Sequence, residues 1–267
     1  MDAAAPAGGG LTFWLGTHEA GWLGRLGVPL CVSRTRLEHR KTLPRAVAPW
    51  VLDSGSFTEL ARHGGQAVPP AVYAAFVRRC RDEIGRLEWA APQDWMCEPF
   101  MLARTGLTVA DHQRLTVENY VELRELDPQL PVIPVLQGWT RDDYLRCADL
   151  YGRHGVDLEA EPLAGLGSVC RRQDTAAAGV IVRALAPLRL HGFGVKVTGL
   201  REFGHRLASA DSLAWSYHAR RNPPLPGCAH ANCANCPRAA LAWRGRLLAS
   251  MTGRWWQDPL FDLDDAS

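Results

Sequence analysis

Eight short apolar segments alternate with helical segments along most of the 267-residue chain. This alternation is typical of parallel sheets, because each parallel strand needs a crossover connection that is usually a helix. Eight repeats predict an α/β fold, a (β/α)8 barrel of the TIM type. An open doubly wound sheet is the alternative, but no glycine-rich phosphate-binding pattern follows the first segment. The expected strands are 11–16, 28–33, 50–57, 87–95, 130–138, 164–168, 188–197 and 210–215.

The expected helices show apolar residues at three- and four-residue spacing. Pro69 and Pro70 suit the first turn of a helix, and Gly155 suits the end of another. The expected helices are 69–87, 108–126, 141–154, 173–185, 200–207 and 238–250.

Polar and glycine residues lie at the ends of most expected strands. In a parallel α/β barrel the active site lies at the carboxyl ends of the strands, so residues at these ends converge on one rim. We therefore expect the functional site on that rim. The residues at these ends are His18, Asp53, Asp94, Gln137, Gly165, Lys196 and Asp211.

A cysteine- and histidine-rich segment follows the last expected strand. Cys228, His230, Cys233 and Cys236 form the pattern C-x-H-x-x-C-x-x-C. Zinc takes four thiolate or imidazole ligands in a tetrahedron, and such short spacings allow one tight turn to provide them. The pattern predicts a structural zinc ion, because four protein ligands leave no open position.

The remaining cysteines are scattered rather than paired by spacing. This distribution, together with the lack of a signal-peptide pattern or a membrane-length apolar run, predicts a cytoplasmic protein with no membrane partner. We expect a flexible N-terminus at 1–10, the barrel over 11–222, the zinc-binding segment with a C-terminal helix over 223–252, and an acidic tail at 253–267.

Five short motifs resemble segments of the tRNA-guanine transglycosylases. They are VLDSGSF for DSGGF, VLQG for Q-G-G, AGLGS for G-G-L, LHGFG for M-G-V-G, and ADSLA for the F-D-S-A of archaeal members. All five occur in the family's order, and the cysteine cluster follows where the family's zinc site lies. The resemblance covers about residues 14–244. The segments GTH, HGFGVK and NCANC resemble the DpdA-type branch, which inserts 7-deazaguanines into DNA.

The resemblance implies a residue-by-residue division of roles in base exchange. Asp211 would be the nucleophile that forms a covalent bond to the sugar, and Asp53 the general acid and base, as in retaining glycosidases. Asp94 would accept hydrogen bonds from the base, and Gln137 would contact its carbonyl edge. The remaining base-binding residues would be Ser54, Phe57, Gly138, Gly165, Leu166 and Gly192.

The chain departs from the family's pattern at three places. Ser56 replaces the second glycine of DSGGF, and D-W-M-C replaces the Asp-Glu-Cys segment around Asp94. His230 lies within the cysteine cluster instead of about two dozen residues downstream.

Net charge is only +2, so binding of a polyanion requires a local basic patch. Arg220 and Arg221, just after Asp211, are placed to contact a nucleic-acid backbone, whereas the basic run 34–45 is either a solvated face or one wall of the barrel mouth. Lys196 is either a solvated rim charge or a phosphate contact, and His18 is either a helix cap or a rim residue.

These features predict a transglycosylase that replaces guanine in DNA with a 7-deazaguanine such as 7-cyano-7-deazaguanine. Exchange in tRNA and ribosyl transfer to free nucleosides are the alternatives; a further RNA-binding domain is not apparent, which favours DNA. A catalytically inactive barrel that binds nucleic acid is disfavoured because both Asp53 and Asp211 are present. A target base in duplex DNA has to be flipped out, so we also expect a helper such as a DNA-dependent ATPase or another modification-system partner.

Overall fold

The structure is a computed structural model that describes residues 10–169 and 175–251. Cys170, the acidic tail and all but the last residue of the expected flexible N-terminus lie outside the described residues.

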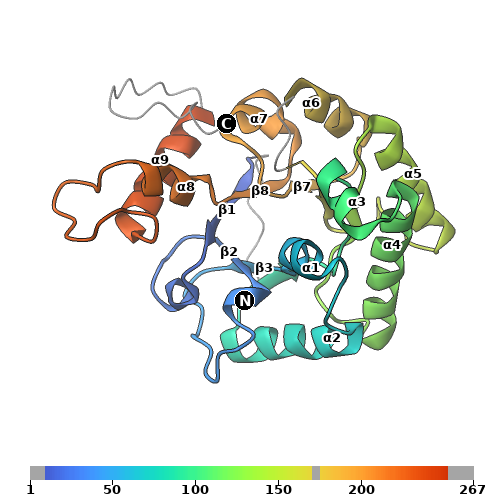
Figure 1. The fold of residues 1–267 in the computed structure, drawn as a ribbon, viewed down its shortest axis with the longest axis horizontal. Coiled ribbons are helices and arrows are strands. Elements are labelled where there is room, and N and C mark those ends of the chain that lie inside the picture. Colours follow the sequence, from blue (N-terminus) through green and yellow to red (C-terminus); the bar gives the residue numbers. More distant parts are fainter. Residues whose placement is uncertain (1–9, 170–174, 252–267) are drawn as a thin grey trace.

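The described residues contain one sheet of eight parallel strands that curls into a TIM-like barrel (Figure 1). The order β4-β3-β2-β1-β8-β7-β6-β5 places the first and last strands of the chain side by side in the middle of the sheet. A parallel bridge joins Ala90 at the end of β4 to Val132, three residues before β5, and so brings the two edges of the sheet together. The fold expected from the alternation is therefore confirmed. The strands are β1 (Thr12–Thr17), β2 (Leu30–Ser33), β3 (Trp50–Asp53), β4 (Leu87–Ala90), β5 (Val135–Leu136), β6 (Ala164–Leu166), β7 (Leu190–Gly192) and β8 (Ser209–Ser212).

Helices surround the sheet, and their apolar faces form the larger core with one face of the strands. None of the described helices has the length and apolar character needed to cross a membrane. The helices are α1 (Ser56–His63), α2 (Pro70–Arg79), α3 (Pro99–Thr105), α4 (Val109–Leu126), α5 (Arg141–Arg153), α6 (Thr175–Ala184), α7 (Val197–Phe203), α8 (Ala214–Arg221) and α9 (Pro237–Met251).

Strand residues alternate between this helix-facing core and a smaller core inside the barrel. Leu52 packs toward the helices, whereas Trp14 and Val51 belong to the inner cluster. Asp53 lies two residues beyond Val51, and Asp211 is the register partner of Trp14. The alternation therefore points both carboxylates toward the interior of the barrel.

Several strands are shorter than the sequence predicts. The segment 130–138 forms a regular strand only at β5, because Pro131 and Pro134 lack the N–H that a strand donates to its neighbour. Pro92 similarly follows the end of β4. The expected strand 188–197 is reduced to β7, and the chain turns at Gly194, where φ is +56°.

Most of the expected helices are present, but two of them have different bounds and three further helices were not expected. The expected helix 69–87 stops earlier: α2 continues as one π-helical turn, Cys80–Ile84, and Gly85 (φ +72°) then ends it. Helix α7 begins three residues before the expected 200–207 and gives way to a 3-10 turn at Gly204–Arg206. The sequence reading missed α1, α3 and α8, which are each seven or eight residues long.

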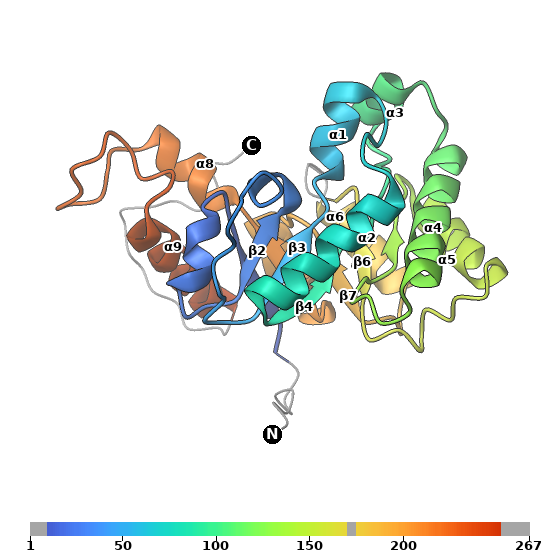
Figure 2. The same ribbon diagram turned by 90° about the horizontal axis from the view of Figure 1, so that it is seen from below.

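Two of the missed helices stand above the rim of the barrel. Figure 2 shows α1 and α3 side by side beyond the carboxyl ends of the strands. Phe57 of α1 and Phe100 of α3 contact each other with ring centroids 6.0 Å apart. Phe57 and Thr58 of α1 line the site described next, and α3 packs behind them.

Candidate active site

A cavity of about 310 Å³ opens at the carboxyl ends of the strands. Its lining comes from all sides of the barrel mouth, including the ends of β1, β3 and β8 and the segments after β4, β5 and β6. Of the residues expected to carry the chemistry, Asp53, Asp94, Gln137, Asp211 and Phe57 line this cavity. The structure thus brings together three sequence-predicted acids and one amide from four different strand ends.

Asp53 and Asp211 are the two carboxylates proposed from the motifs to act on the sugar. Asp53 is held by the backbone N–H of Gly55, 3.2 Å from Oδ2, and by the side chain of Ser33. Asp211 Oδ1 accepts the backbone N–H of Gly194 at 2.8 Å. Both carboxylates are partly buried, so their charges act on one another through a medium that screens them poorly.

The environment of Asp53 favours its protonated form. Burial raises the pKa of Asp53, and the negative charge of Asp211 raises it further, while the hydrogen bonds from Ser33 and Gly55 act in the opposite direction. A carboxyl group with a raised pKa can carry a proton at neutral pH and donate it to a leaving group.

Asp94 forms a buried pair with Gln137 beside the two acids. Gln137 donates from Nε2 to Asp94 Oδ2 at 2.6 Å, and Ser54 Oγ lies 3.4 Å from Oδ1. Burial, and then the charge of Asp53, raises the pKa of Asp94 to about 7. The pair presents a carboxyl group and an amide on one wall, which is the combination needed to read the edge of a purine.

The sequence reading missed three residues on this wall. Ser168 Oγ lies 2.7 Å from Gln137 Oε1 and 2.9 Å from Glu98 Oε2, and so connects the buried amide with a further carboxylate. Gly167 leaves room for this arrangement, because a Cβ there would lie 2.2 Å from Gln137 Nε2. Glu98, Ser168 and Gly167 all line the cavity. Gly167 and Ser168 belong to the AGLGS motif, and Glu98 lies three residues after the expected strand 87–95.

Five of the residues expected to bind the base do not line the cavity. Ser54 is buried behind Asp94 and Ser56, and Gly138 packs against the start of α5. Leu166 and Gly192 are register partners whose side of the strand faces the helices. Gly165 faces the barrel interior, where a Cβ would lie 2.5 Å from Phe193 Cε2. Direct contact between these five residues and the base therefore stays a prediction. Their positions outside the cavity lining do not support it.

Positive charge gathers on the β1 and β2 side of the mouth. His18 and Arg36 line the cavity, and burial followed by the charges of Arg36 and Arg220 lowers the pKa of His18. His18 is not a helix cap, because Glu19 is the N-cap of the following 3-10 helix and no side chain caps it. Arg220 is exposed on α8, so it can reach both this side of the mouth and solvent.

The other basic residues named from the sequence occupy different positions. Arg221 is exposed and stacks 3.3 Å above the centroid of the Tyr217 ring. Lys196 is the half-buried N-cap of α7 and does not line the cavity. Arg34, the first residue of the basic run, is buried and paired with Glu38 and Glu59, so it is part of neither a solvated face nor a basic wall.

The cysteine and histidine side chains converge between α8 and α9. One ligand atom from each of the four residues lies within 4.8 Å of all the others, with Cys228 and Cys236 Sγ 3.9 Å apart and His230 Nε2 3.1 Å from Cys233 Sγ. Three thiolates and an imidazole at this spacing fit a tetrahedral metal ion such as zinc. Ala219 of α8 packs against the cluster, and α9 begins directly after Cys236.

The parallel barrel has a cluster of acids at the end where enzymes of this fold carry their active sites, and the family model that matches the chain implies a transglycosylase-like enzyme. The chain belongs to the DpdA family, DeoxyPurine in DNA protein A, whose family model matches residues 11–263. Membership in this family indicates a role in deazapurine modification of DNA. Comparison with individual curated proteins gives no match.

Proposed function

We propose that this protein exchanges guanine in DNA for a 7-deazaguanine, such as 7-cyano-7-deazaguanine, through a covalent bond between Asp211 and the deoxyribose. The observation that carries the proposal is the placement of Asp53 and Asp211 on one cavity, with the Asp94–Gln137 pair on its wall. Two acids for the sugar and a polar pair for the base are the groups that such an exchange needs.

In the first half of the reaction, an oxygen of Asp211 bonds to C1′ of the sugar while the bond from C1′ to the guanine nitrogen breaks. The electron pair of the broken bond passes to guanine, which takes a proton from Asp53 and leaves. The raised pKa of Asp53 supports this role, because the carboxyl group has to be protonated before the step.

In the second half, the ionised Asp53 removes the ring proton of the incoming base. The nitrogen of that base attacks C1′, the ester bond breaks, and Asp211 is released as a carboxylate. Each acid thus returns to its starting state, and the covalent intermediate prevents loss of a reactive oxocarbenium ion to water.

Base recognition is assigned to the buried wall. Asp94 accepts hydrogen bonds from the N–H groups of the guanine-like edge, and Gln137 contacts its carbonyl side. The hydrogen bond between them, 2.6 Å long, orients both groups before the base enters. Phe57, beside the cavity and in contact with Phe100, offers an aromatic face for stacking.

DNA is the preferred polymer because of the family to which the chain belongs. Arg36 and Arg220 at the mouth would neutralise phosphates next to the target nucleotide, with Arg221 and Lys196 further out. A base in a duplex has to leave the stack to reach a cavity of this kind, and we include a DNA-dependent ATPase or other modification-system partner in the proposal.

The four-residue cluster is assigned to structural zinc. Bound there, zinc would supply folding energy by joining the end of α8 to the start of α9. A reducing, cytoplasmic location is part of the proposal, because the cysteines outside the cluster are scattered along the sequence rather than spaced as disulfide pairs.

The test is isotope exchange followed by nucleoside mass spectrometry. The protein, with cell extract as a source of any partner, is incubated with labelled 7-cyano-7-deazaguanine and with DNA, tRNA or free guanosine. Incorporation into DNA, weakened steeply by salt and by Arg220→Ala, is expected. Incorporation into tRNA or nucleosides alone, or into none of the three, would overturn the proposal.

A further inference from the structure

One buried titratable side chain next to the proposed nucleophile has no assigned role. His191 lies on β7 inside the barrel and is fully buried. The rings of Trp89 and Phe193 contact it edge-on, each with its centroid 4.6 Å from that of the imidazole. Gly165 makes space for Phe193, as described above. The imidazole is therefore held in one orientation by aromatic neighbours.

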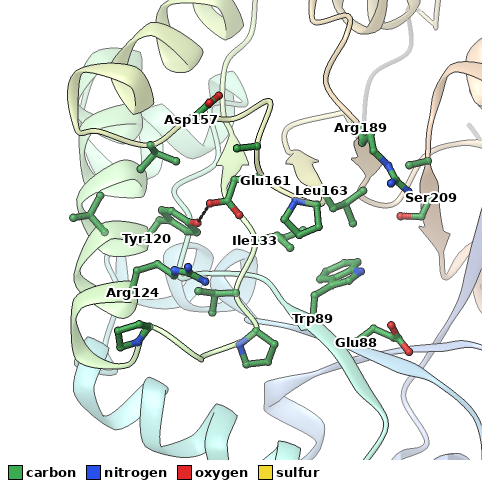
Figure 3. Close-up of a pocket in the computed structure, with 18 of the residues that line it drawn as sticks. Glu88, Trp89, Tyr120, Arg124, Ile133, Asp157, Glu161, Leu163, Arg189 and Ser209 are labelled. Carbon is green, nitrogen blue, oxygen red and sulfur yellow. Dashed lines mark hydrogen bonds between the residues drawn. The ribbon is translucent and has the colours of Figure 1, made fainter. Parts of the chain in front are cut away.

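The two ring nitrogens of His191 face different partners. Nδ1 lies 2.8 Å from Ser209 Oγ, and Nε2 lies 3.4 Å from Asp211 Oδ1. Ser209 itself lies on the lining of the groove at the opposite end of the barrel (Figure 3). If Nδ1 carried the only proton, the lone pair of Nε2 would face a carboxylate oxygen. The geometry therefore favours the form in which Ser209 donates to Nδ1 and the proton is on Nε2.

The N–H at Nε2 faces one carboxylate oxygen, Asp211 Oδ1. Nε2 is buried and forms no well-aligned hydrogen bond with any described residue. The 3.4 Å contact with Asp211 is an ion-pair distance that a small rotation of the carboxylate would shorten. Catalytic hydrogen bonds are commonly long before substrate binds and tighten in the reacting complex.

This contact makes the two oxygens of Asp211 different. Oδ1 accepts the Gly194 N–H at 2.8 Å and also faces His191 Nε2. Oδ2 accepts no hydrogen bond from the part of the chain that the structure describes. An oxygen that is held by one donor and faces a second is a weaker nucleophile than an oxygen with none.

We propose that His191 is a positioning residue that holds Asp211 Oδ1, so that Oδ2 is the oxygen that attacks the sugar. This inference rests on the function proposed above. The Oδ2 lone pair forms the bond to C1′ as the bond from C1′ to guanine breaks, and guanine takes its proton from Asp53. His191 transfers no proton: it donates to Oδ1 while that oxygen becomes the carbonyl of the ester, and it still does so when the ester is broken.

The experiment compares three variants in the exchange of labelled guanine into a guanine-containing DNA oligonucleotide, an assay that does not depend on the identity of the natural base. His191→Phe preserves an aromatic ring in the interior and removes the N–H. His191→Gln retains an amide N–H near the position of Nε2. Ser209→Ala removes the hydroxyl that selects the imidazole tautomer. The adduct is measured on denaturing gels in single-turnover reactions, beside kcat and KM for guanine.

His191→Phe should slow adduct formation by about 10- to 100-fold, the range typical of losing a partner that orients a reactive-site ligand. KM for guanine should stay near the wild-type value, because Asp94 and Gln137 are unchanged. His191→Gln should recover most of the rate, and Ser209→Ala should lose less than His191→Phe. A histidine needed only for packing would give the opposite order, since Phe fits the aromatic surroundings better than Gln.

Wild-type adduct formation in His191→Phe, or a slower rate in His191→Gln than in His191→Phe, would overturn this inference and leave the proposed function intact. If His191→Phe does not fold, His191→Gln is compared with Ser209→Ala instead. Full activity in Ser209→Ala together with an inactive, folded His191→Gln would overturn the inference about His191. Failure of the wild-type protein to form any Asp211 adduct would instead overturn the proposed function.

Discussion

Acidic side chains have different neighbours at the two ends of the barrel. The groove at the amino ends of the strands is the larger space, about 970 Å³ against about 310 Å³ for the cavity at the carboxyl ends (Figure 3). In the groove, Glu161 accepts a 2.8 Å hydrogen bond from Tyr120, and Arg124 lies nearby (Figure 3). In the cavity, neither Asp53 nor Asp94 forms an ion pair with a described lysine or arginine.

The proposed active site therefore lies in the smaller of the two spaces, and its acids rather than its size set it apart. Burial raises the pKa of Asp53 and of Asp94, and a neighbouring carboxylate raises each further: Asp211 acts on Asp53, and Asp53 acts on Asp94. Keeping both acids ionised is therefore unfavourable for stability. In the groove, Glu161 is bonded to the hydroxyl of Tyr120 and has the cationic Arg124 nearby (Figure 3), so we expect this end to serve stability. We therefore expect substitutions at the carboxyl end to reduce activity, and matched substitutions at the amino end to change stability alone.

The largest expected effect is the loss of the covalent adduct in Asp211→Ala. Asp211 is the proposed nucleophile, so trapping with DNA should give a denaturation-resistant adduct in the wild-type protein and none in the variant. Glu161→Gln, at the other end of the barrel, is the matched control and should form the adduct at the wild-type rate. An adduct that persists in Asp211→Ala and disappears in Asp53→Ala would show that the two roles are reversed.

Asp53→Asn should be the next most severe change. The amide keeps the size of the side chain and removes the proton that guanine needs, a loss typically worth ~10²–10⁴-fold in rate. KM for the base should change little, because Gln137 and Asp94 are intact. Steady-state exchange kinetics measure both constants, and a rate within about threefold of wild type would remove Asp53 from the acid–base role.

Removing a metal ligand tests whether the carboxyl end depends on the cluster beside it. Cys233→Ser should lose zinc and about 3 kcal/mol of stability, or roughly 6–12 °C in Tm, because structural zinc contributes directly to folding. Helix α8 connects the cluster to Asp211, so activity should fall as well. Metal analysis and calorimetry give the readouts. Soluble, folded wild-type protein without zinc would contradict the prediction.

Asp94 should make stability depend on pH. Its pKa is raised to about 7 from an ordinary value of 3.8, so the folded protein binds this proton more tightly than the unfolded chain does. The associated stability is fully present below pH 4 and is lost as the pH rises from about 4 to about 7. Asp94→Asn removes this loss.

The free energy of unfolding of Asp94→Asn, minus that of the wild type, should therefore be larger at pH 8 than at pH 5. The increase should be on the order of 2 kcal/mol. Urea unfolding at the two pH values measures the difference, and Asp127→Asn, on the outside of the barrel, is a control. An equal effect of Asp94→Asn at both pH values would contradict the raised pKa.

The smallest expected effect is at the amino end. Tyr120→Phe removes the hydroxyl that donates to Glu161 and keeps the ring, which packs against Tyr151 with centroids 5.6 Å apart. Stability should fall by about 1 kcal/mol, the usual value of one such hydrogen bond, and exchange activity should not change. A large loss of activity would mean that the groove takes part in function, and the contrast between the two ends would fail.

Much of this arrangement follows from local sequence patterns. The alternation of apolar and amphipathic segments predicts the barrel, because period 2 and period 3.6 patterns are set by the backbone itself. The rule that parallel strands share one rim then places Asp53, Asp94, Gln137 and Asp211 together. The spacing of the cysteines brings the metal ligands together within one turn, so that cluster needs no distant contact.

Other features depend on contacts between distant segments, which no local pattern contains. The lengths of β4 and β5 follow from prolines in an otherwise apolar run. The family resemblance did not predict whether each residue of β6 and β7 points to the barrel interior or to the helices. Leu166 and Gly192 face the helices, whereas Gly165 and His191 face the interior, because strand register fixes inward and outward positions only once the barrel has closed. Sequence alone determined which acids share the rim. Tertiary packing decided that Ser168 and Glu98 join Gln137, and that an imidazole 20 residues before Asp211 lies against one of its two oxygens.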